Sequence, residues 1–287
     1  MLRTNRDRLV KMAVGGIISP PTMARGPHRL KASGEPFIPI GTAGVVYNAR
    51  PGCPAFGWAG DHLEPAVCVH AVDPEEDHAL HYLANLGNDA TVVSGEAKGA
   101  RGRVLGEHAR FILDFSEDDM RRMCPGDRVQ ITAWGTGLEL LDYPHIRVWK
   151  LDPRLLDLMG IEAAGAGVLR VPVTHILPSR TMGSGWELNP EYVDQDICSN
   201  DPATVAAFGL ETLRTGDVVA VTDAEHWTGR GYREGAMVVG VINHGNSWQL
   251  GHGPGCMTVL SCRTPHLQPV IDPGANIARY LGAGVFA

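Results

Sequence analysis

The sequence predicts a mainly β protein, with a β-sandwich-like main body, an inserted small SH3-like barrel and a few short helices. Glycine and proline, at 35 and 20 of the 287 residues, exceed their usual combined share of about 12% and imply many turns and short elements. Short runs that are rich in β-branched residues and bounded by Gly, Pro or Asp are typical of strands. Such runs occupy residues 91–94, 128–133, 147–151, 217–222, 236–243 and 257–261.

Helix signals are fewer and short. Residues 153–160 and 202–209 share one pattern: an Asp before the helix, Pro at its first position and Gly at its end, which suit an N-cap, N1 and C′ respectively. Ser116 begins a capping box that predicts a helix of one or two turns. Residues 75–86 carry apolar side chains at helical spacing and form the longest predicted helix.

Residues 91–150 have the features of an inserted unit with its own core. A glycine-punctuated hairpin over residues 95–106 is followed by strand-like runs at 111–115, 128–133 and 147–151, and together these could complete a five-stranded barrel. We therefore expect an inserted small β-barrel at 91–150. The main β domain, which carries the site, would combine residues 1–90 with 151–287.

Composition bears on partners and location. With 25 Lys and Arg against 32 Asp and Glu the net charge is −7, so no basic excess favours nucleic-acid binding. No apolar run approaches the ~18 residues of a membrane span, and the first residues do not resemble a signal peptide. The six cysteines lack CxxC spacing and are expected to be free thiols. We expect a cytoplasmic protein that binds neither nucleic acid nor membrane. The uncharged residues 280–287 predict docking on a neighbour, and hence a homo-oligomer.

The first chemical motif lies in residues 56–65. Asp61 and His62 stand next to each other on a glycine turn in an otherwise apolar stretch. Together they could bind a metal, or form a pair in which the carboxylate orients a catalytic imidazole. The alternative is a turn in which Asp61 only caps the backbone.

The second motif covers residues 222–235. Asp223 and His226, at i and i+3 after an apolar strand, are further metal candidates. Arg230, between two glycines, could bind a substrate carboxylate bidentately, with Tyr232 beside it. A charged surface loop is the alternative.

The third motif, residues 240–255, gives the strongest signal. His244 ends an apolar strand, His252 stands within Gly-His-Gly-Pro-Gly, and Asn246 and Ser247 lie between them. Glycines around His252 would let the backbone approach a ligand; a plain glycine hairpin is the alternative. The motif is neither a P-loop nor a dinucleotide fingerprint, so no nucleotide cofactor is expected.

Two smaller pieces could join these motifs. Gly183, Ser184 and Gly185 could hold an anion on backbone amides, or form a simple turn. Asp194 and Asp196 are spaced to share one face of an extended chain, where they could hold a hard cation or a substrate amine, or lie on a solvated edge. His108 and the remaining histidines lack such a context, and we expect them on the surface or satisfied in the core.

The chain resembles a prokaryotic family catalogued as domain of unknown function 4438. The segments that carry the resemblance are FGWAGDHLEP, VVSGEAKGARGRVLGEH, MGSG, DQDI, DAEHWTGRGYREGA and INHGNSWQLGHGPG. It implies a mostly β protein with a small barrel in a larger sandwich. This chain has Asn246 where the family usually has an acidic residue, so a metal or proton role of that acid would be lost here.

These observations favour a metal-dependent hydrolase acting on a small amide or ester, which could bear a carboxylate. Asp61, His62, Asp223 and His226 would bind a divalent ion, Zn²⁺ or Mn²⁺, that activates water, and His252 or His62 would act as general base, with His244 nearby. Arg230 and the amides of Gly183 to Gly185 would hold the substrate. A metal-free lyase or isomerase, in which His244 or His252 moves a proton, and a non-catalytic ligand-binding or regulatory protein are the alternatives.

Overall fold

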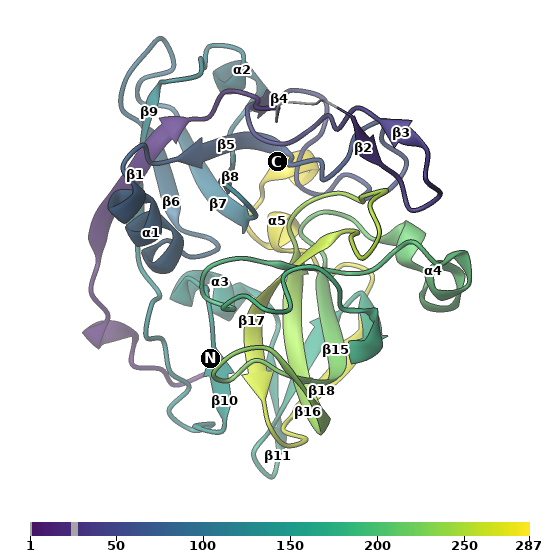
Figure 1. The fold of residues 1–287 in the computed structure, drawn as a ribbon. Helices are drawn as coiled ribbons and strands as arrows, with labels where there is room; N and C mark the ends of the chain where they lie inside the picture. The colour runs from purple at the N-terminus through teal and green to yellow at the C-terminus, as the bar shows by residue number, and fades with distance from the viewer. Residues whose placement is uncertain (1, 24–27) are drawn as a thin grey trace.

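The computed structural model describes residues 2–23 and 28–287 and confirms a mainly β fold with a few short helices. Six antiparallel strands close into a barrel in the order β1-β9-β6-β7-β8-β5, and β5 pairs back with β1 (Figure 1). Their bounds are β1 (Met12–Ile18), β5 (Ala66–His70), β6 (Asp89–Val92), β7 (Arg101–Glu107), β8 (Phe111–Asp114) and β9 (Arg128–Ala133), with the short β4 (Val45–Val46) added to β5.

The barrel therefore does not have the boundaries expected from the sequence. Residues 91–150 supply β7, β8, β9 and part of β6, and these strands alone would leave two open edges. Strands β1 and β5, from the N-terminal part of the chain, satisfy those edges and close the barrel. Closure removes unpaired backbone groups, which is why the predicted five-stranded insertion becomes a six-stranded barrel that spans residues 12–133.

A second sheet forms the other half of the molecule. It runs β10-β17-β16-β15-β13, and β14 pairs with β17 (Figure 1). The bounds are β10 (Ile146–Val148), β13 (His175–Pro178), β14 (Gln195–Asp196), β15 (Val218–Glu225), β16 (Gly231–Ile242) and β17 (Gly255–Cys262). A three-stranded sheet of β11 (Glu162–Gly165), β12 (Val168–Val173) and β18 (Leu267–Ile271) packs against it through β12 and β15. The hairpin β2 (Arg29–Leu30) and β3 (Pro36–Phe37) lies apart from these sheets.

Burial explains why the central strands read as continuous apolar runs. Val218 and Ala220 of β15 belong to the large core shared with the barrel and with β12. Val219 and Val221, on the other face of the same strand, pack into two smaller clusters. A strand covered on both faces needs apolar side chains at every position.

The helices follow the predicted capping signals. Asp152 and Asp201 accept hydrogen bonds from backbone amides at the starts of α3 (Pro153–Leu158) and α4 (Pro202–Phe208), and Gly209 ends α4 in the left-handed conformation. The others are α1 (Pro74–Leu83), α2 (Glu117–Met120) and α5 (Ile277–Tyr280). Among the described residues, none of these helices has the length and apolar character needed to cross a bilayer.

The C-terminal segment docks within its own chain. The amide of Gly284 donates to Asp114 Oδ2 of the barrel at 2.6 Å, and the amide of Val285 donates to the carbonyl of Pro51 at 2.9 Å. Ala283 and Gly284 are buried. The segment that suggested a homo-oligomer is thus occupied by intramolecular contacts, and the oligomer remains an untested prediction.

Candidate metal centre

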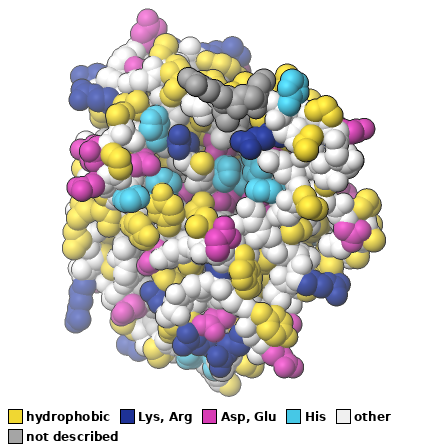
Figure 2. Space-filling model, in the orientation of Figure 1, with side chains coloured by type: hydrophobic (Ala, Val, Ile, Leu, Met, Phe, Trp, Pro, Cys, Tyr) yellow, Lys and Arg dark blue, Asp and Glu magenta, His cyan; other side chains and the backbone are white. Residues whose placement is uncertain are grey.

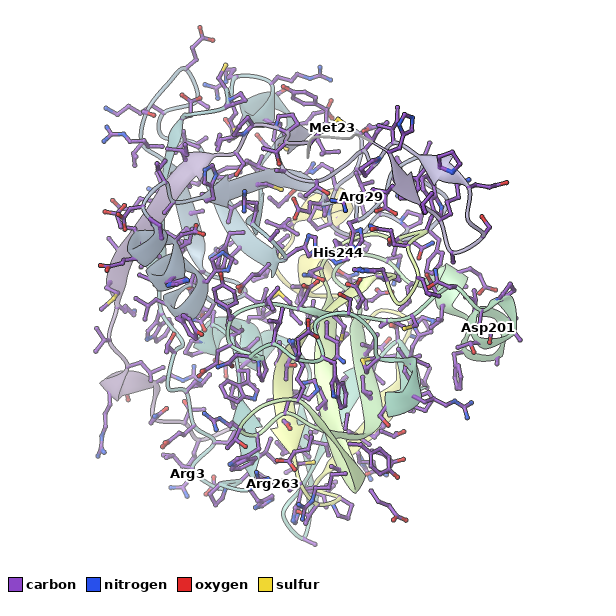
Figure 3. The ribbon with its side chains drawn as sticks, in the orientation of Figure 1. Arg3, Met23, Arg29, Asp201, His244 and Arg263 are labelled. Carbon is purple, nitrogen blue, oxygen red and sulfur yellow. The ribbon has the colours of Figure 1, made fainter. Side chains whose placement is uncertain are left out.

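Four histidines and two aspartates meet where the barrel faces the second sheet. Figure 3 labels one of them, His244, between the two halves of the molecule. The barrel side contributes His62, from the loop before β5, and His108, after β7. The sheet side contributes His244, just after β16, and His252, just before β17. Ring centroids lie 5.4 Å apart for His62 and His108, 4.9 Å for His62 and His252, and 4.2 Å for His108 and His244. Asp194 and Asp196, from β14 and the residue before it, lie among these rings.

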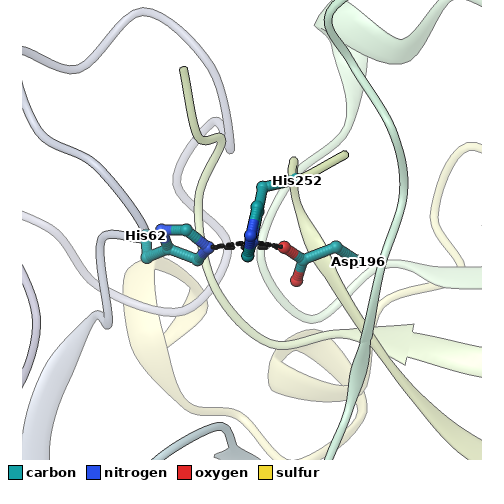
Figure 4. A group of neighbouring side chains, drawn as sticks. All are labelled: His62, Asp196 and His252. Carbon is teal, nitrogen blue, oxygen red and sulfur yellow. Dashed lines mark hydrogen bonds and ion pairs between the residues drawn. The ribbon is translucent and has the colours of Figure 1, made fainter. Parts of the chain in front are cut away.

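One group of three ligands opens toward the surface. His62 Nε2 lies 3.0 Å from His252 Nδ1 and 3.3 Å from Asp196 Oδ2, and His252 Nδ1 lies 2.7 Å from that oxygen (Figure 4). With metal–nitrogen bonds of about 2.0–2.1 Å, two nitrogens on one ion lie about 2.9–3.4 Å apart. The observed nitrogen–nitrogen distance suits two ligands of the same ion.

A second group lies deeper. His244 Nε2 is 2.9 Å from Asp194 Oδ2 and 3.3 Å from Asp196 Oδ1. His108 completes this group, whose three ligand atoms all lie within 4.8 Å of one another. The side chain of His244 is fully buried, whereas that of His252 is 30% exposed. His108 of the second group is 19% exposed, so His244 is the histidine of the cluster that is sealed from solvent.

A surrounding layer of acceptors fixes which nitrogen of each ring faces the centre. His62 Nδ1 lies 2.8 Å from Asp61 Oδ2, His108 Nδ1 lies 2.7 Å from Glu64 Oε1, and His244 Nδ1 lies 2.8 Å from the carbonyl of Gly245. Each contact places a proton on Nδ1 and leaves Nε2 directed inward. Histidines that bind metals in proteins are oriented in this way.

Asp61, which the sequence predicts as a metal ligand, instead orients the His62 ring and belongs to neither group of candidate ligands. Besides His62, it accepts hydrogen bonds from Ser247 Oγ at 2.9 Å, the Trp248 amide at 2.8 Å and Gln249 Nε2 at 3.1 Å. His62 itself holds a left-handed backbone conformation, φ +51°, a strained state that functional sites often store.

The imidazoles of the cluster keep its two buried carboxylates ionised. Burial alone raises the pKa of Asp196, but the neighbouring imidazoles of His244, His252 and His62 hold it well below its ordinary value. Burial likewise raises the pKa of Asp194, and the charges of His244 and His108 lower it overall. Burial lowers the pKa of His244, but Asp194 and Asp196 outweigh it and raise that pKa well above normal. Two buried carboxylates thus stay ionised, and the imidazoles beside them supply the balancing positive charge in the metal-free protein.

The outer group borders a cavity of about 650 Å³. His62, His108 and His252 form part of its wall, and Arg29, Ile40 and Gln249 are among the other lining residues. Figure 2 shows histidines reaching this face of the molecule beside Lys or Arg side chains. The cavity has the size of a small-molecule site.

Several predicted site residues lie together as expected. His62, His244 and His252 all face the cluster, and Ser247 holds Asp61. Asn246 contributes through its backbone, because its carbonyl accepts the His62 amide hydrogen bond at 3.0 Å. Its side-chain oxygen accepts a hydrogen bond from Ser199 Oγ.

Asp223 and His226, by contrast, do not join the cluster. Asp223 accepts the Gly235 amide at 2.9 Å beside an irregularity between β15 and β16, where its own φ is +57°. His226 is buried against Thr258, with Nδ1 2.7 Å from Thr258 Oγ1. Because the chain bulges at Asp223, the helical turn that would have paired the two side chains does not form.

The predicted substrate-binding residues also have structural partners. Arg230 donates to the carbonyls of Gly185, at 2.5 Å, and Val193, so it anchors the segment that leads to Asp194. The Gly183 amide donates to the Asp196 carbonyl at 2.8 Å and Ser184 to that of Gly251 at 2.9 Å. Tyr232 is 68% exposed on β16. Arg230, Gly183 and Ser184 thus hold the segments around Asp194, Asp196 and Gly251 in place, whereas Tyr232 takes no part in these contacts.

Sequence reasoning missed His108 and placed Asp194 and Asp196 only among lesser candidates. His108 follows the end of β7 just as His244 follows the end of β16, and that shared position was the available signal. Glu64 lies within the first motif, but its role depends on His108 lying 2.7 Å away across 44 residues of chain.

Comparison with known proteins agrees with this architecture. Residues 28–157 match the N-terminal and residues 158–281 the C-terminal part of a family described as a domain of unknown function, DUF4438. This division differs from the expected insertion, and it places His62 and His108 in one part and the other four ligands in the second. No protein with a curated description matches the chain.

One solved structure, titled "Crystal structure of TM1086", is similar to this chain, with 37% identity and a TM-score of 0.93. The match covers 97% of this chain and 99% of that one. The family matches account for nearly all of the described residues, including every member of the histidine and aspartate cluster. The chain therefore belongs to the DUF4438 family of proteins of unknown function.

Proposed function

We propose that this protein is a metal-dependent hydrolase that acts on a small amide or ester. The observation that supports this most directly is the convergence of His62 Nε2, His252 Nδ1 and Asp196 Oδ2 at the wall of a cavity. Imidazole with carboxylate suits Zn²⁺ and Mn²⁺. This ligand set replaces the one expected from the sequence, because Asp223 and His226 bind other partners.

A divalent ion at this position would lower the pKa of a bound water and polarise a substrate carbonyl. The chain supplies the orientation: Asp61 fixes the His62 ring, and Asp196 supplies the anionic ligand. Because His62 and His252 point ligand nitrogens at the same place, we assign them to metal binding and no longer to general-base catalysis.

The cavity wall indicates the kind of substrate. Arg29 lines the same cavity as the three histidines, where an arginine can bind a carboxylate. Since Arg230 is occupied by backbone carbonyls, Arg29 takes over the role expected of it. We therefore propose a substrate with a carboxylate next to the scissile bond, such as an N-acyl amino acid.

The test uses the full-length protein, stripped with a chelator and reloaded with Zn²⁺ or Mn²⁺. We expect a panel of N-acyl amino acids and p-nitrophenyl esters to contain a substrate whose hydrolysis requires the ion. His252→Ala should reduce turnover at least ~10²-fold, whereas Arg29→Gln should raise KM for carboxylate-bearing substrates only. Metal-independent turnover would refute the proposal.

The alternative of a metal-free lyase or isomerase has one observation in its favour. His252 Nδ1 lies 2.7 Å from Asp196 Oδ2 in a partly exposed side chain, and such an imidazole–carboxylate pair can move a proton. Full activity in the chelated protein would support this reading. Ligand binding without any turnover would instead indicate a binding protein.

A further inference from the structure

The two oxygens of Asp196 face different partners. Oδ2 lies 2.7 Å from His252 Nδ1 and 3.3 Å from His62 Nε2, whereas Oδ1 lies 3.3 Å from His244 Nε2. Asp196 is therefore shared between the outer and the inner group of ligands. One carboxylate with an oxygen in each of two ligand sets is arranged as a bridge between two cations.

The inner group contains an unpaired ring nitrogen. Although His244 Nε2 lies 2.9 Å from Asp194 Oδ2, it makes no hydrogen bond to any described residue, and its side chain is fully buried. A protonated nitrogen would aim its hydrogen at one of the two nearby carboxylates. The misalignment, together with the Nδ1 contact to the Gly245 carbonyl, suits an Nε2 lone pair that binds a cation in place of that proton.

A second unpaired buried atom belongs to a side chain that contacts the inner group. Asn243 Oδ1 is buried and has no hydrogen-bond partner among the described residues, while Asn243 Nδ2 donates to Asp194 Oδ2 at 2.9 Å. Gly255 makes room there: a Cβ at this position would lie 2.0 Å from Asp194 Oδ2 and 2.3 Å from Asn243 Oδ1. Only a glycine at position 255 leaves Asp194 and Asn243 in this arrangement.

We propose that the centre holds two divalent ions, bridged by Asp196. The outer ion would be bound by His62, Asp196 and His252, and the inner ion by His108, Asp194, His244 and the shared Asp196. This proposal deepens the proposed function, on which its outer ion rests. It adds a second ion to the hydrolase, in the arrangement by which two-metal enzymes, with ions about 3.5–4 Å apart, act on one substrate.

The first test is the Mn²⁺ content of wild-type protein that has been stripped, reloaded at saturation and freed of excess ion. We expect two equivalents per chain by mass spectrometry of the metal. Electron paramagnetic resonance should show an exchange-coupled pair in place of the six-line signal of isolated Mn²⁺. One equivalent, no retained ion, or two uncoupled ions would each overturn the proposal without reliance on any variant.

Single variants then assign the ions. His252→Ala and His108→Ala should each retain one equivalent of Mn²⁺ and lose the coupled signal. Asp196→Asn should lose most of the Mn²⁺ from both sites. The control His78→Ala, at an exposed histidine of α1, should keep two equivalents. Circular dichroism confirms that each variant is folded. His108→Ala with two coupled ions would contradict the assignment of the inner site.

The outcomes separate this inference from the function it deepens. Two coupled ions in a protein that hydrolyses no member of the substrate panel would refute the hydrolase and leave the two-ion centre standing. One ion together with metal-dependent hydrolysis would refute the second ion and leave the hydrolase standing.

Discussion

A substitution at Asp61 tests directly whether this carboxylate orients the His62 ring for metal binding. The replacement Asp61→Asn keeps the size of the side chain but exchanges one acceptor oxygen for an NH₂ group. Asp61 is 1% exposed and accepts hydrogen bonds from His62 Nδ1, Ser247 Oγ, the Trp248 amide and Gln249 Nε2. Because donors face both oxygens of Asp61, the NH₂ group of the asparagine must face at least one of these donors and cannot accept its hydrogen bond.

The expected magnitude follows from this geometry. Loss of a carboxylate that orients a metal-binding histidine weakens metal affinity by about 10–100-fold, which corresponds to about 1.4–2.7 kcal/mol. Loss of a buried charge-assisted hydrogen bond should also lower the stability of the metal-free protein by about 1.5–3 kcal/mol.

The assay is a Mn²⁺ titration in which the free ion is measured by its six-line resonance signal, with Tm of the metal-free protein recorded in parallel. Ser247→Ala is the matched control, because it removes one donor to Asp61 and leaves the contact with His62. We expect its Mn²⁺ affinity to stay within about 3-fold of wild type. Wild-type affinity in Asp61→Asn, or equal weakening in both variants, would refute the orienting role.

Three further predictions concern the frame around the site. Gly255→Ala should destabilise the protein by about 1–3 kcal/mol and weaken Mn²⁺ binding. The control is Gly231→Ala, where an added Cβ meets nothing within 4 Å, and it should change Mn²⁺ binding little. Equal losses of Mn²⁺ binding in the two variants would contradict an effect of crowding at Gly255. Burial lowers the pKa of His226 in the folded protein to about 3, whereas an unperturbed histidine has a pKa of ~6.5. Between these two pH values the unfolded protein binds a proton on His226 that the folded protein does not. The free energy of unfolding should therefore fall by about 1.4 kcal/mol per pH unit below pH ~6.5. Urea titrations at several pH values should show a smaller slope in His226→Gln and the wild-type slope in His78→Gln. An unchanged slope in His226→Gln would refute the role of His226. Removal of residues 281–287 should lower Tm, because buried Asp114 then loses the hydrogen bond from the Gly284 amide at a cost of about 1–3 kcal/mol. An unaltered Tm with a change of mass in light scattering would instead assign the segment to assembly.

Local features of the sequence determined much of the fold. The Asp-Pro pairs at 152 and 201 start helices where expected, because N-capping depends only on the first helical turn. The β-branched run in β15 forms a strand, because such a run fits a sheet covered on both faces. His62, His244 and His252 could be singled out since each stands in a glycine turn or at a strand end.

Only the tertiary structure decided which of the polar residues meet. His62 and His252 lie 190 residues apart and His62 and Asp196 lie 134 apart, and no local pattern encodes such distances. The pairing of β14 with β17 brings Asp196 opposite Gly255, and closure of the barrel by β1 and β5 fixes His62 and His108 on the facing side. Asp223, His226 and Arg230 also carried a local signal, but in the folded chain they bind a backbone amide, a hydroxyl and carbonyl groups outside the cluster. Strand pairing over long chain separations, with the burial that it imposes, selects the partners of each ionisable group.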